Sequence, residues 1–382
     1  MVSIAFTGGG TGGHIYPGLA IASRLKELMP LRLFWIGSSE GMDRAIVEKA
    51  GLEFAGIPSG KLRRYFSLQN ASDVFKVGAG FFAARRILKQ EKPALLFSKG
   101  GFVSVPPCVA AASLGIPVFT HESDYSPGLA TRINTRFAER VFIPYKESAR
   151  FFPGMESGKI SVSGNPIRPE FAAADPAKGR AFLGLGDAER VLLVLGGSLG
   201  SREINGLVRA ALPELVRHYT VVHQTGEGDA SAQGLPPGAA GRYKPYAYFG
   251  DEIPHIIAAA ELVLCRSGAG TIWECASLRK PMVLIPLRGS GTRGDQVENA
   301  RLFAEAGAAL CFTDNDSNAE KLSADKLSGL IASLAEDPER RKGMAEADIA
   351  VSNASAFIAE EIVRRITYTI NIGRLNEQYS DS

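Results

Sequence analysis

The chain has 382 residues, a formal net charge of +3 at pH 7 and a hydrophobic content of 45%. This length is enough for two or three domains with cores of their own, and the nearly balanced charge argues against wholesale nucleic-acid binding. No apolar run is long enough to span a bilayer, and the chain enters its first expected strand at once, so we expect no signal peptide. The four cysteines are scattered without metal-site or disulfide spacing, which favours a reducing cytoplasm.

The first twenty residues predict a strand, a glycine-rich turn and a helix. Residues 2–6 are short, apolar and partly β-branched, and TGGGTGGHIYPG follows from Thr7 to Gly18. Glycines let the backbone approach a ligand closely, and the free N–H groups at a helix N-terminus favour negative charge. The turn is therefore a candidate anion site.

Two known phosphate-binding motifs fail at this turn. The glycine spacing fits the dinucleotide fingerprint, but the second expected strand, 31–36, ends without the acid that would hold a ribose. A P-loop is excluded because His14 stands where the motif needs lysine. His14 is either a cap or packed ring, which residue type alone favours, or a group that titrates near neutrality beside a substrate.

Strands and helices then alternate through the first half of the chain. A helix is predicted over 42–49 and ends at Gly51. Further strands are predicted over 54–57, 94–98, 117–120, 141–143 and 160–163. Three of them open into the loops KGGFVSVPP (99–107), HESDYSPG (121–128) and GNPIRPEF (164–171). Repeated βα units of this kind predict a parallel, doubly wound sheet.

The same plan restarts after a boundary rich in proline and alanine at 165–177. An apolar strand over 190–195 leads into GGSLGS (196–201) and a helix over 203–217. Later strands are predicted over 220–224, 262–265, 282–285 and 309–312. We expect two Rossmann-like domains that face each other across a cleft, with ligands outside the carboxyl ends of the strands.

Residues 61–92 stand apart by their charge. They hold eight basic and two acidic residues, an excess of six positive charges. Five aromatic residues interleave with the bases: Tyr65, Phe66, Phe75, Phe81 and Phe82. The segment is either a helix with a packed apolar face and a solvated basic face, or a surface that lies on anionic lipid headgroups. The local charge excess keeps both interpretations open.

The second half holds the densest polar motifs. CRSGAGTIWE (265–274) predicts a strand, a glycine turn and a helix start whose N–H groups suit a diphosphate. Thr271 and Glu274 have the spacing of a capping box, which is favoured over ribose binding on spacing alone. PLRGSGTRGDQVENA (286–300) predicts a long polar loop and a helix start at Asp295 and Gln296, which either bind sugar hydroxyls or are the polar residues common at any helix start. The acid-x-acid pattern at 314–316 suits a turn and cap better than a metal, so we expect no metal and no cofactor.

Seven motifs in one order carry a family resemblance. They are GGGTGGHIYPG (8–18), SKGGFVSVPP (98–107), HESDYSPGLATR (121–132), GNPIR (164–168), GGSLGS (196–201), CRSGAGTIWE (265–274) and DQVENA (295–300). Over residues 4–365 the chain resembles the MurG family of N-acetylglucosaminyltransferases. The resemblance implies an α/β, GT-B fold and a metal-independent, inverting transfer of N-acetylglucosamine from UDP-GlcNAc to the muramoyl 4-hydroxyl of lipid I, which makes lipid II for peptidoglycan.

The resemblance also divides the chain by role. It implies an acceptor-binding, membrane-docking domain over 1–165 and a UDP-GlcNAc-binding domain over 166–350. Residues 351–382 would form a C-terminal helix that returns toward the first domain and ends in a frayed tail. The enzyme would lie peripherally on the cytoplasmic face of the bacterial inner membrane. Phe81, Phe82, Arg85 and Arg86 would contact its anionic leaflet, association with other cell-wall enzymes stays open, and no nucleic acid is expected.

By position in the motifs, the resemblance assigns the substrate-binding and catalytic residues. Glu274 would bind the ribose, Gln296 the sugar hydroxyls, and Gly250 the uracil through its backbone. The other donor-site positions are Thr11, Gly12, Gly13, Asp124, Arg168, Ser198, Ala269, Gly270 and Thr271. His14 and Glu122 would act at the acceptor hydroxyl, His14 as first candidate for the base.

Three positions depart from the family pattern. Asp124 stands where asparagine is usual, and a carboxylate accepts hydrogen bonds but cannot donate them. Leu199 replaces a glutamine, and Asp295 stands where glutamine or histidine is common. The alternatives are another GT-B glycosyltransferase with a different lipid or small-molecule acceptor, an NAD-dependent enzyme, which the missing acid after Ile36 disfavours, and a non-catalytic nucleotide-binding module.

Overall fold

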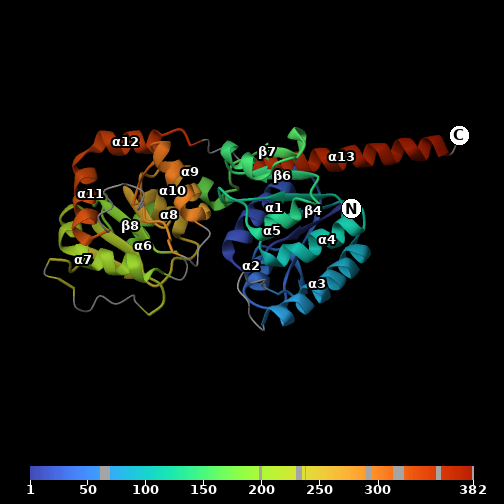
Figure 1. The fold of residues 1–382 in the computed structure, drawn as a ribbon. Helices are drawn as coiled ribbons and strands as arrows, with labels where there is room; N and C mark the ends of the chain where they lie inside the picture. The colour runs from blue at the N-terminus through green and yellow to red at the C-terminus, as the bar shows by residue number, and fades with distance from the viewer. Residues whose placement is uncertain are drawn as a thin grey trace. The chain divides into compact units, whose positions relative to one another are not determined.

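The computed structural model describes residues 1–60, 69–197, 200–228, 235–236, 238–289, 294–312, 322–349 and 354–380. Over 69–74 and 372–380 it describes the backbone alone. The chain forms two compact units, coloured along the chain in Figure 1. Unit 1 comprises Met1–Arg168 and Ser352–Ser382, and unit 2 comprises Pro169–Val351.

Unit 1 is built on a seven-stranded parallel sheet in the order β3-β2-β1-β4-β5-β6-β7. Its strands are β1 Ser3–Thr7, β2 Arg32–Ser38, β3 Glu53–Ile57, β4 Leu95–Ser98, β5 Val118–His121, β6 Arg140–Ile143 and β7 Ile160–Val162. Every residue of β1, β4 and β5 is buried, as expected for central strands covered on both faces. The order runs outward from β1 in both directions, so the loops after β1 and β4 lie side by side.

Helices cover both faces of this sheet. They are α1 Tyr16–Leu28, α2 Asp43–Lys49, α3 Gln69–Glu91, α4 Val105–Ser113, α5 Leu129–Asn134 and α13 Ala354–Ser380, with short 3-10 helices η1 Gly12–His14, η2 Phe102–Ser104, η3 Lys146–Phe151 and η4 Ser157–Lys159. The long C-terminal helix α13 packs beside α1 (Figure 1). Its residues Ile358, Ala359 and Ile362 are fully buried in the core beneath β1 and β4. The backbone of α13 is helical to Ser380.

Unit 2 repeats the plan with a six-stranded parallel sheet in the order β10-β9-β8-β11-β12-β13. Its strands are β8 Val191–Leu195, β9 Thr220–Gln224, β10 Tyr243–Tyr246, β11 Leu262–Cys265, β12 Met282–Leu284 and β13 Ala309–Cys311. Its helices are η5 Pro169–Ala173, α6 Pro176–Leu183, α7 Arg202–His218, α8 Ile253–Ala259, α9 Ala269–Ser277, α10 Asp295–Glu305, α11 Ala324–Glu336 and α12 Pro338–Glu346. Two doubly wound parallel sheets confirm the predicted α/β class.

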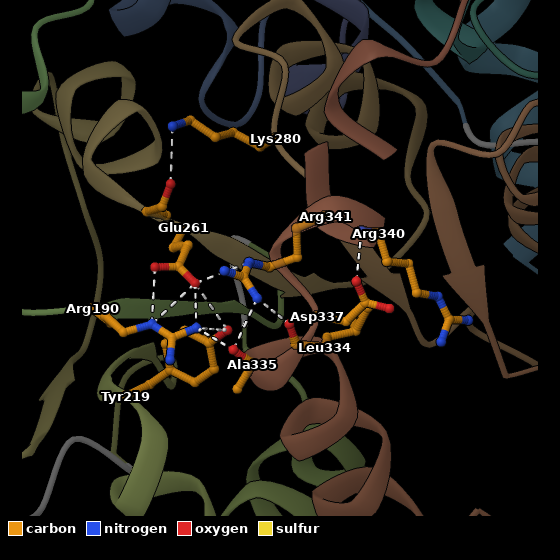
Figure 2. Close-up of polar contacts among 10 residues, drawn as sticks. Arg190, Tyr219, Glu261, Lys280, Leu334, Ala335, Asp337, Arg340 and Arg341 are labelled. Atoms are coloured by element: carbon orange, nitrogen blue, oxygen red, sulfur yellow. Dashed lines mark hydrogen bonds and ion pairs between the residues drawn. The ribbon is translucent and has the colours of Figure 1, made fainter. Parts of the chain in front are cut away.

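An ion-pair network closes the amino-terminal edge of the second sheet (Figure 2). Arg190, just before β8, pairs with Glu261 at 2.6 Å, and Arg341 of α12 pairs with the same carboxylate at 3.0 Å. The Tyr219 hydroxyl also donates to Glu261, at 3.2 Å. Burial raises the pKa of Glu261, but hydrogen bonds and charges from Arg190 and Arg341 outweigh it and lower the pKa. The network fixes α12 to the amino-terminal ends of the strands. The glycine-rich loops lie at the opposite, carboxyl edge of the sheet.

Most predicted strands and helices are confirmed to within two residues, but β10 is not predicted by the sequence. Lys244 and Pro245 interrupt any apolar alternation there. Proline cannot donate to a ladder and is tolerated at sheet edges, and β10 is an edge strand.

Candidate functional site

The loop between β1 and α1 is held by a buried carboxylate. Asp43, at the start of α2, is 1% exposed; its Oδ1 accepts from the Gly10 N–H at 2.9 Å and its Oδ2 from the Ser38 N–H at 3.1 Å. The Trp35 indole donates to the Gly8 carbonyl at 2.9 Å. The glycine-rich loop is therefore fixed from β2 and α2. Asp43 is not among the residues predicted from the sequence, because a lone acid at a helix start offers no signal of this role.

The loop after β4 packs directly on the glycine-rich loop. Gly101 has a φ of +77°, and a Cβ atom there would lie 2.7 Å from the Gly9 carbonyl oxygen and 3.0 Å from the His14 ring. The two loops thus approach as closely as glycine permits. The His14 Nδ1 lies 3.3 Å from the Lys99 carbonyl oxygen. Since a carbonyl only accepts, this hydrogen bond requires the proton on Nδ1 and leaves the lone pair of the neutral ring on Nε2.

Glu122 is buried and its carboxylate binds its own loop. Oε1 accepts from the Ser123 and Asp124 N–H groups at 2.9 and 3.1 Å, and Oε2 accepts from the Gly128 N–H at 3.1 Å. Gly128 precedes α5, so the carboxylate also sits near a helix N-terminus. These contacts suit a residue that shapes the loop, and its predicted role at the acceptor hydroxyl stays a prediction.

Arg168 and the turn residues Thr11, Gly12 and Gly13 share one region of unit 1. Gly12 belongs to η1, Thr11 and Gly13 are exposed, and Gly12 is half-buried. The Arg168 guanidinium lies 5.2 Å from the centre of the Tyr16 ring, at the start of α1. A cation–π contact therefore places the arginine beside the predicted anion-binding turn.

In unit 2, Gln224 links the glycine turn after β8 to the segment after β10. Its side-chain amide donates to the Gly197 carbonyl at 3.0 Å and accepts from the Phe249 N–H at 3.0 Å. Gly250 follows directly and is exposed. The turn and the predicted uracil contact are thus brought together, by a glutamine at a strand end that sequence reasoning passed over. Ser198 and Leu199 lie outside the described residues.

A second set of contacts gathers the loops after β11 and β12. Arg266 donates to the Ser201 hydroxyl at 2.7 Å and to the Ile285 carbonyl at 3.1 Å. The Ser267 hydroxyl donates to the Gln296 carbonyl at 2.7 Å, and the Gln296 side chain accepts from the Leu287 N–H at 2.9 Å. Gln296 is therefore positioned at the start of α10 next to the glycine turn of α9.

Helix α9 corrects the capping-box prediction. Its N-cap is Gly268, so Ala269 and Gly270 form its first turn and Thr271 follows. Thr271 therefore lies inside the helix and cannot cap it, and Glu274 lies one turn too late for a capping box. Glu274 is half-buried. A capping box therefore does not explain why a glutamate stands at this position. The N–H groups of the first turn have no acceptor within the helix, as at every helix start, and diphosphate binding there stays a prediction.

Helix α3 divides the four predicted membrane residues between two environments. Phe82 is 71% exposed and Arg86 is exposed, whereas Phe81 and Arg85 are half-buried. Phe81 packs partly against the core, with its ring 5.2 Å from that of Phe82. Phe75 is 80% exposed and shares the outer face with Phe82. Lys61, Arg63, Arg64, Tyr65 and Phe66 lie outside the described residues.

Two features are absent from the described residues, a metal-binding cluster and a membrane-spanning helix. Among them, no cluster of three or more histidine, cysteine or acidic side chains is arranged to hold a metal ion. No helix in the same part of the chain has the length and apolar character needed to cross a membrane. The acid-x-acid pattern at 314–316 lies outside the described residues.

Comparisons with known proteins agree with the motifs. The N-terminal domain model of glycosyltransferase family 28 matches residues 4–143, and its C-terminal domain model matches 191–361. A protein of Treponema denticola named UDP-N-acetylglucosamine–N-acetylmuramyl-(pentapeptide) pyrophosphoryl-undecaprenol N-acetylglucosamine transferase is 49% identical over 83% of this chain and 85% of its own. A protein of the same name from Clostridium perfringens is 41% identical over 84% of this chain and 87% of its own.

Solved structures confirm the fold. The crystal structure of Acinetobacter baumannii MurG has a TM-score of 0.72 at 24% identity, over 95% of this chain and all of that one. A UDP-GlcNAc 2-epimerase of Neisseria meningitidis, bound to UDP-GlcNAc, has a TM-score of 0.69 at 14% identity, over 96% of this chain and all of that one. The fold is therefore GT-B, and the chain belongs to glycosyltransferase family 28 and, within it, to the MurG family.

Proposed function

We propose that this glycosyltransferase moves N-acetylglucosamine from UDP-GlcNAc to the muramoyl 4-hydroxyl of lipid I, with inversion at the anomeric carbon, and so makes lipid II. The 49% identity with a relative named for this transfer, over most of both chains, carries the proposal. Glycine-rich loops at the carboxyl edges of both sheets support it, because that edge is where doubly wound sheets bind nucleotides and sugars.

The donor is assigned to unit 2. The α9 N-terminus, from Gly268 to Thr271, offers N–H groups and a positive dipole end to the diphosphate. As UDP leaves, negative charge grows there, and fixed N–H donors stabilise it without reorganisation. Glu274 would accept from ribose hydroxyls and Gln296 would read sugar hydroxyls, with Gly250 near the uracil.

The acceptor is assigned to unit 1, with His14 as the base. The proton that the Lys99 carbonyl holds on Nδ1 leaves Nε2 to take the acceptor proton as its oxygen attacks. Glu122 would position the neighbouring loop through its three backbone contacts.

The outer face of α3 is assigned to the membrane. Phe75, Phe82, Arg86 and Lys89 are exposed and fall on one side of the helix, opposite the fully buried Ala84 and Leu88. A stripe of aromatic and basic side chains suits an anionic lipid surface. An acceptor with a polyprenyl tail stays in the bilayer, so such a surface would bring the protein to the cytoplasmic face of the inner membrane.

Transfer of labelled N-acetylglucosamine from UDP-GlcNAc to a short-chain lipid I analogue, with EDTA present, tests the proposal. Transfer establishes the substrate pair and the independence from metal together. UDP-GlcNAc binding without transfer would leave the donor site standing and overturn the acceptor. Other lipid-linked or small-molecule acceptors would then be assayed, because a different GT-B transferase is the second candidate.

A further inference from the structure

Lys99 is a buried cation at the point where three loops of unit 1 meet. It follows β4 directly, and its N–H donates to the Thr7 carbonyl at the end of β1, at 2.8 Å. The residue is 1% exposed. Its ammonium group donates to the Ser123 hydroxyl at 2.8 Å, in the loop after β5. Its carbonyl oxygen faces His14.

Two acidic residues of the loop after β5, Glu122 and Asp124, act on the charge of the buried ammonium. Burial lowers the pKa of Lys99 to about 8, and the negative charges of Glu122 and Asp124 oppose that shift. The only other titratable groups that the described contacts bring to it are His121 and His14. Burial and the charge of Lys99 hold the pKa of His121 well below its usual value, so His121 is neutral. The compensating charges for Lys99 are therefore the two carboxylates.

The residues bound by Lys99 belong to the loop assigned to the substrates. Ser123 and Asp124 donate their N–H groups to Glu122, and the Ser123 carbonyl accepts from the Asn165 side chain at 2.9 Å. The ammonium thus reaches this loop while the main chain of the same residue accepts from His14. Lys99 therefore connects the candidate base, His14, to the loop that contains Asp124, a residue at which this chain differs from the family pattern.

We propose that Lys99 is a positioning residue for the transfer. Its ammonium group neutralises the Glu122–Asp124 pair and, through Ser123, holds their loop in register with His14. Asp124 is then an acidic partner of Lys99 in this loop. An uncharged residue at 99 is compatible with activity only when residue 124 is uncharged as well.

This inference depends on the proposed function, and a double-mutant cycle separates the two. The four proteins are wild type, Lys99→Met, Asp124→Asn and the double variant, all as full chains, assayed for transfer to the lipid I analogue. Methionine matches the length of lysine without its charge. We expect Lys99→Met to lower kcat at least ten-fold, because it leaves the buried Glu122 and the half-buried Asp124 without a compensating charge. The double variant should regain most of that loss.

The pH profile reports charge, which a purely structural role would not move. Wild-type kcat should fall above about pH 8 as Lys99 loses its proton, and this fall should vanish in the double variant. The proposal would be overturned if Lys99→Met kept the kcat of wild type. It would also be overturned if the fold-loss of kcat in the double variant equalled or exceeded the product of the fold-losses in the two single variants. If Lys99→Met does not fold, a folded and active double variant supports it and an unfolded one overturns it.

Lys280→Met is the matched control. Lys280 is also a largely buried lysine whose pKa is lowered by burial, but its ammonium donates to the Ala258 and Ala260 carbonyls in unit 2. The Lys280→Met substitution should change kcat by the same factor in wild type and in Asp124→Asn.

If the wild-type protein showed no transfer, that result would overturn the proposed acceptor and not the role of Lys99. The coupling of Lys99 to Asp124 would then be read from thermal midpoints of the four proteins, where additive shifts would overturn the charge pair.

Discussion

His14 and Lys99 are joined through the imidazole of one and the main chain of the other, with 3.3 Å between Nδ1 and the carbonyl oxygen. The contact sets the tautomer of the only histidine in the glycine-rich turn and leaves Nε2 as the basic nitrogen. It also explains why two glycine-rich loops approach so closely here. Larger residues at Gly101 would push the His14 ring out of place.

Replacement of His14 by alanine should separate chemistry from binding. We expect kcat to fall by a factor of about 10² to 10⁴, the usual range for loss of a general base, with little change in the Kd for UDP-GlcNAc. Single-turnover transfer and calorimetric titration measure the two quantities. His218→Ala, on α7 of unit 2, is the control and should leave both unchanged. Near-normal turnover in His14→Ala would remove His14 as the base.

Replacement of Asp43 by alanine should destabilise the glycine-rich loop. Two buried N–H groups, of Gly10 and Ser38, would lose their acceptor, which costs about 2–5 kcal/mol of unfolding free energy. Asp175→Ala is the comparison, because Asp175 caps α6 through one N–H at an exposed helix start. It should cost about 1 kcal/mol. Urea denaturation measures both, and equal losses would contradict the fixing role of Asp43.

Charge reversal on α3 should release the protein from lipid. Arg85→Glu with Arg86→Glu should weaken binding to vesicles of phosphatidylglycerol and phosphatidylcholine, by about 1 kcal/mol for each basic charge lost. The matched control is Arg340→Glu with Lys342→Glu, which changes the charge equally on exposed residues of α12. Vesicle sedimentation gives the affinities. If the α3 and α12 double substitutions weakened vesicle binding equally, the protein would be responding only to its net charge. The assignment of α3 as the docking face would then be wrong.

The Lys99 proton should link stability to pH in the direction opposite to activity. The pKa of Lys99 in the folded protein, about 8, lies below the ordinary lysine value of 10.5, so the unfolded chain binds more protons between these pH values. The unfolding free energy of wild type relative to Lys99→Met should therefore rise with pH across this window, by up to about 3 kcal/mol. Chemical denaturation at several pH values measures the difference. A flat difference would mean that Lys99 is not a charged, desolvated group below pH 8.

The sequence predicted most of the secondary structure and the order of its motifs. Parallel sheets are buried on both faces, so β1, β8 and β11 appear as continuous apolar runs that end in glycine-rich turns, and such runs are readable without coordinates. The sequence did not predict the edge strand β10 or the true start of α9. Proline masks an edge strand, and a capping-box pattern two residues inside a helix looks the same in sequence as one at its start.

The sequence by itself determined the family, through the order of the motifs. It also determined which residue types are present in the loops at the strand ends. Only the tertiary structure decided which side chains hold those loops, because the contacts join residues far apart in the chain. Asp43 reaches Gly10 across 33 positions, and Lys99 reaches Ser123 across 24 and His14 across 85. A buried lysine or aspartate carries no local signal, since its burial and its partners arise only when the strands pair and bring their carboxyl ends together.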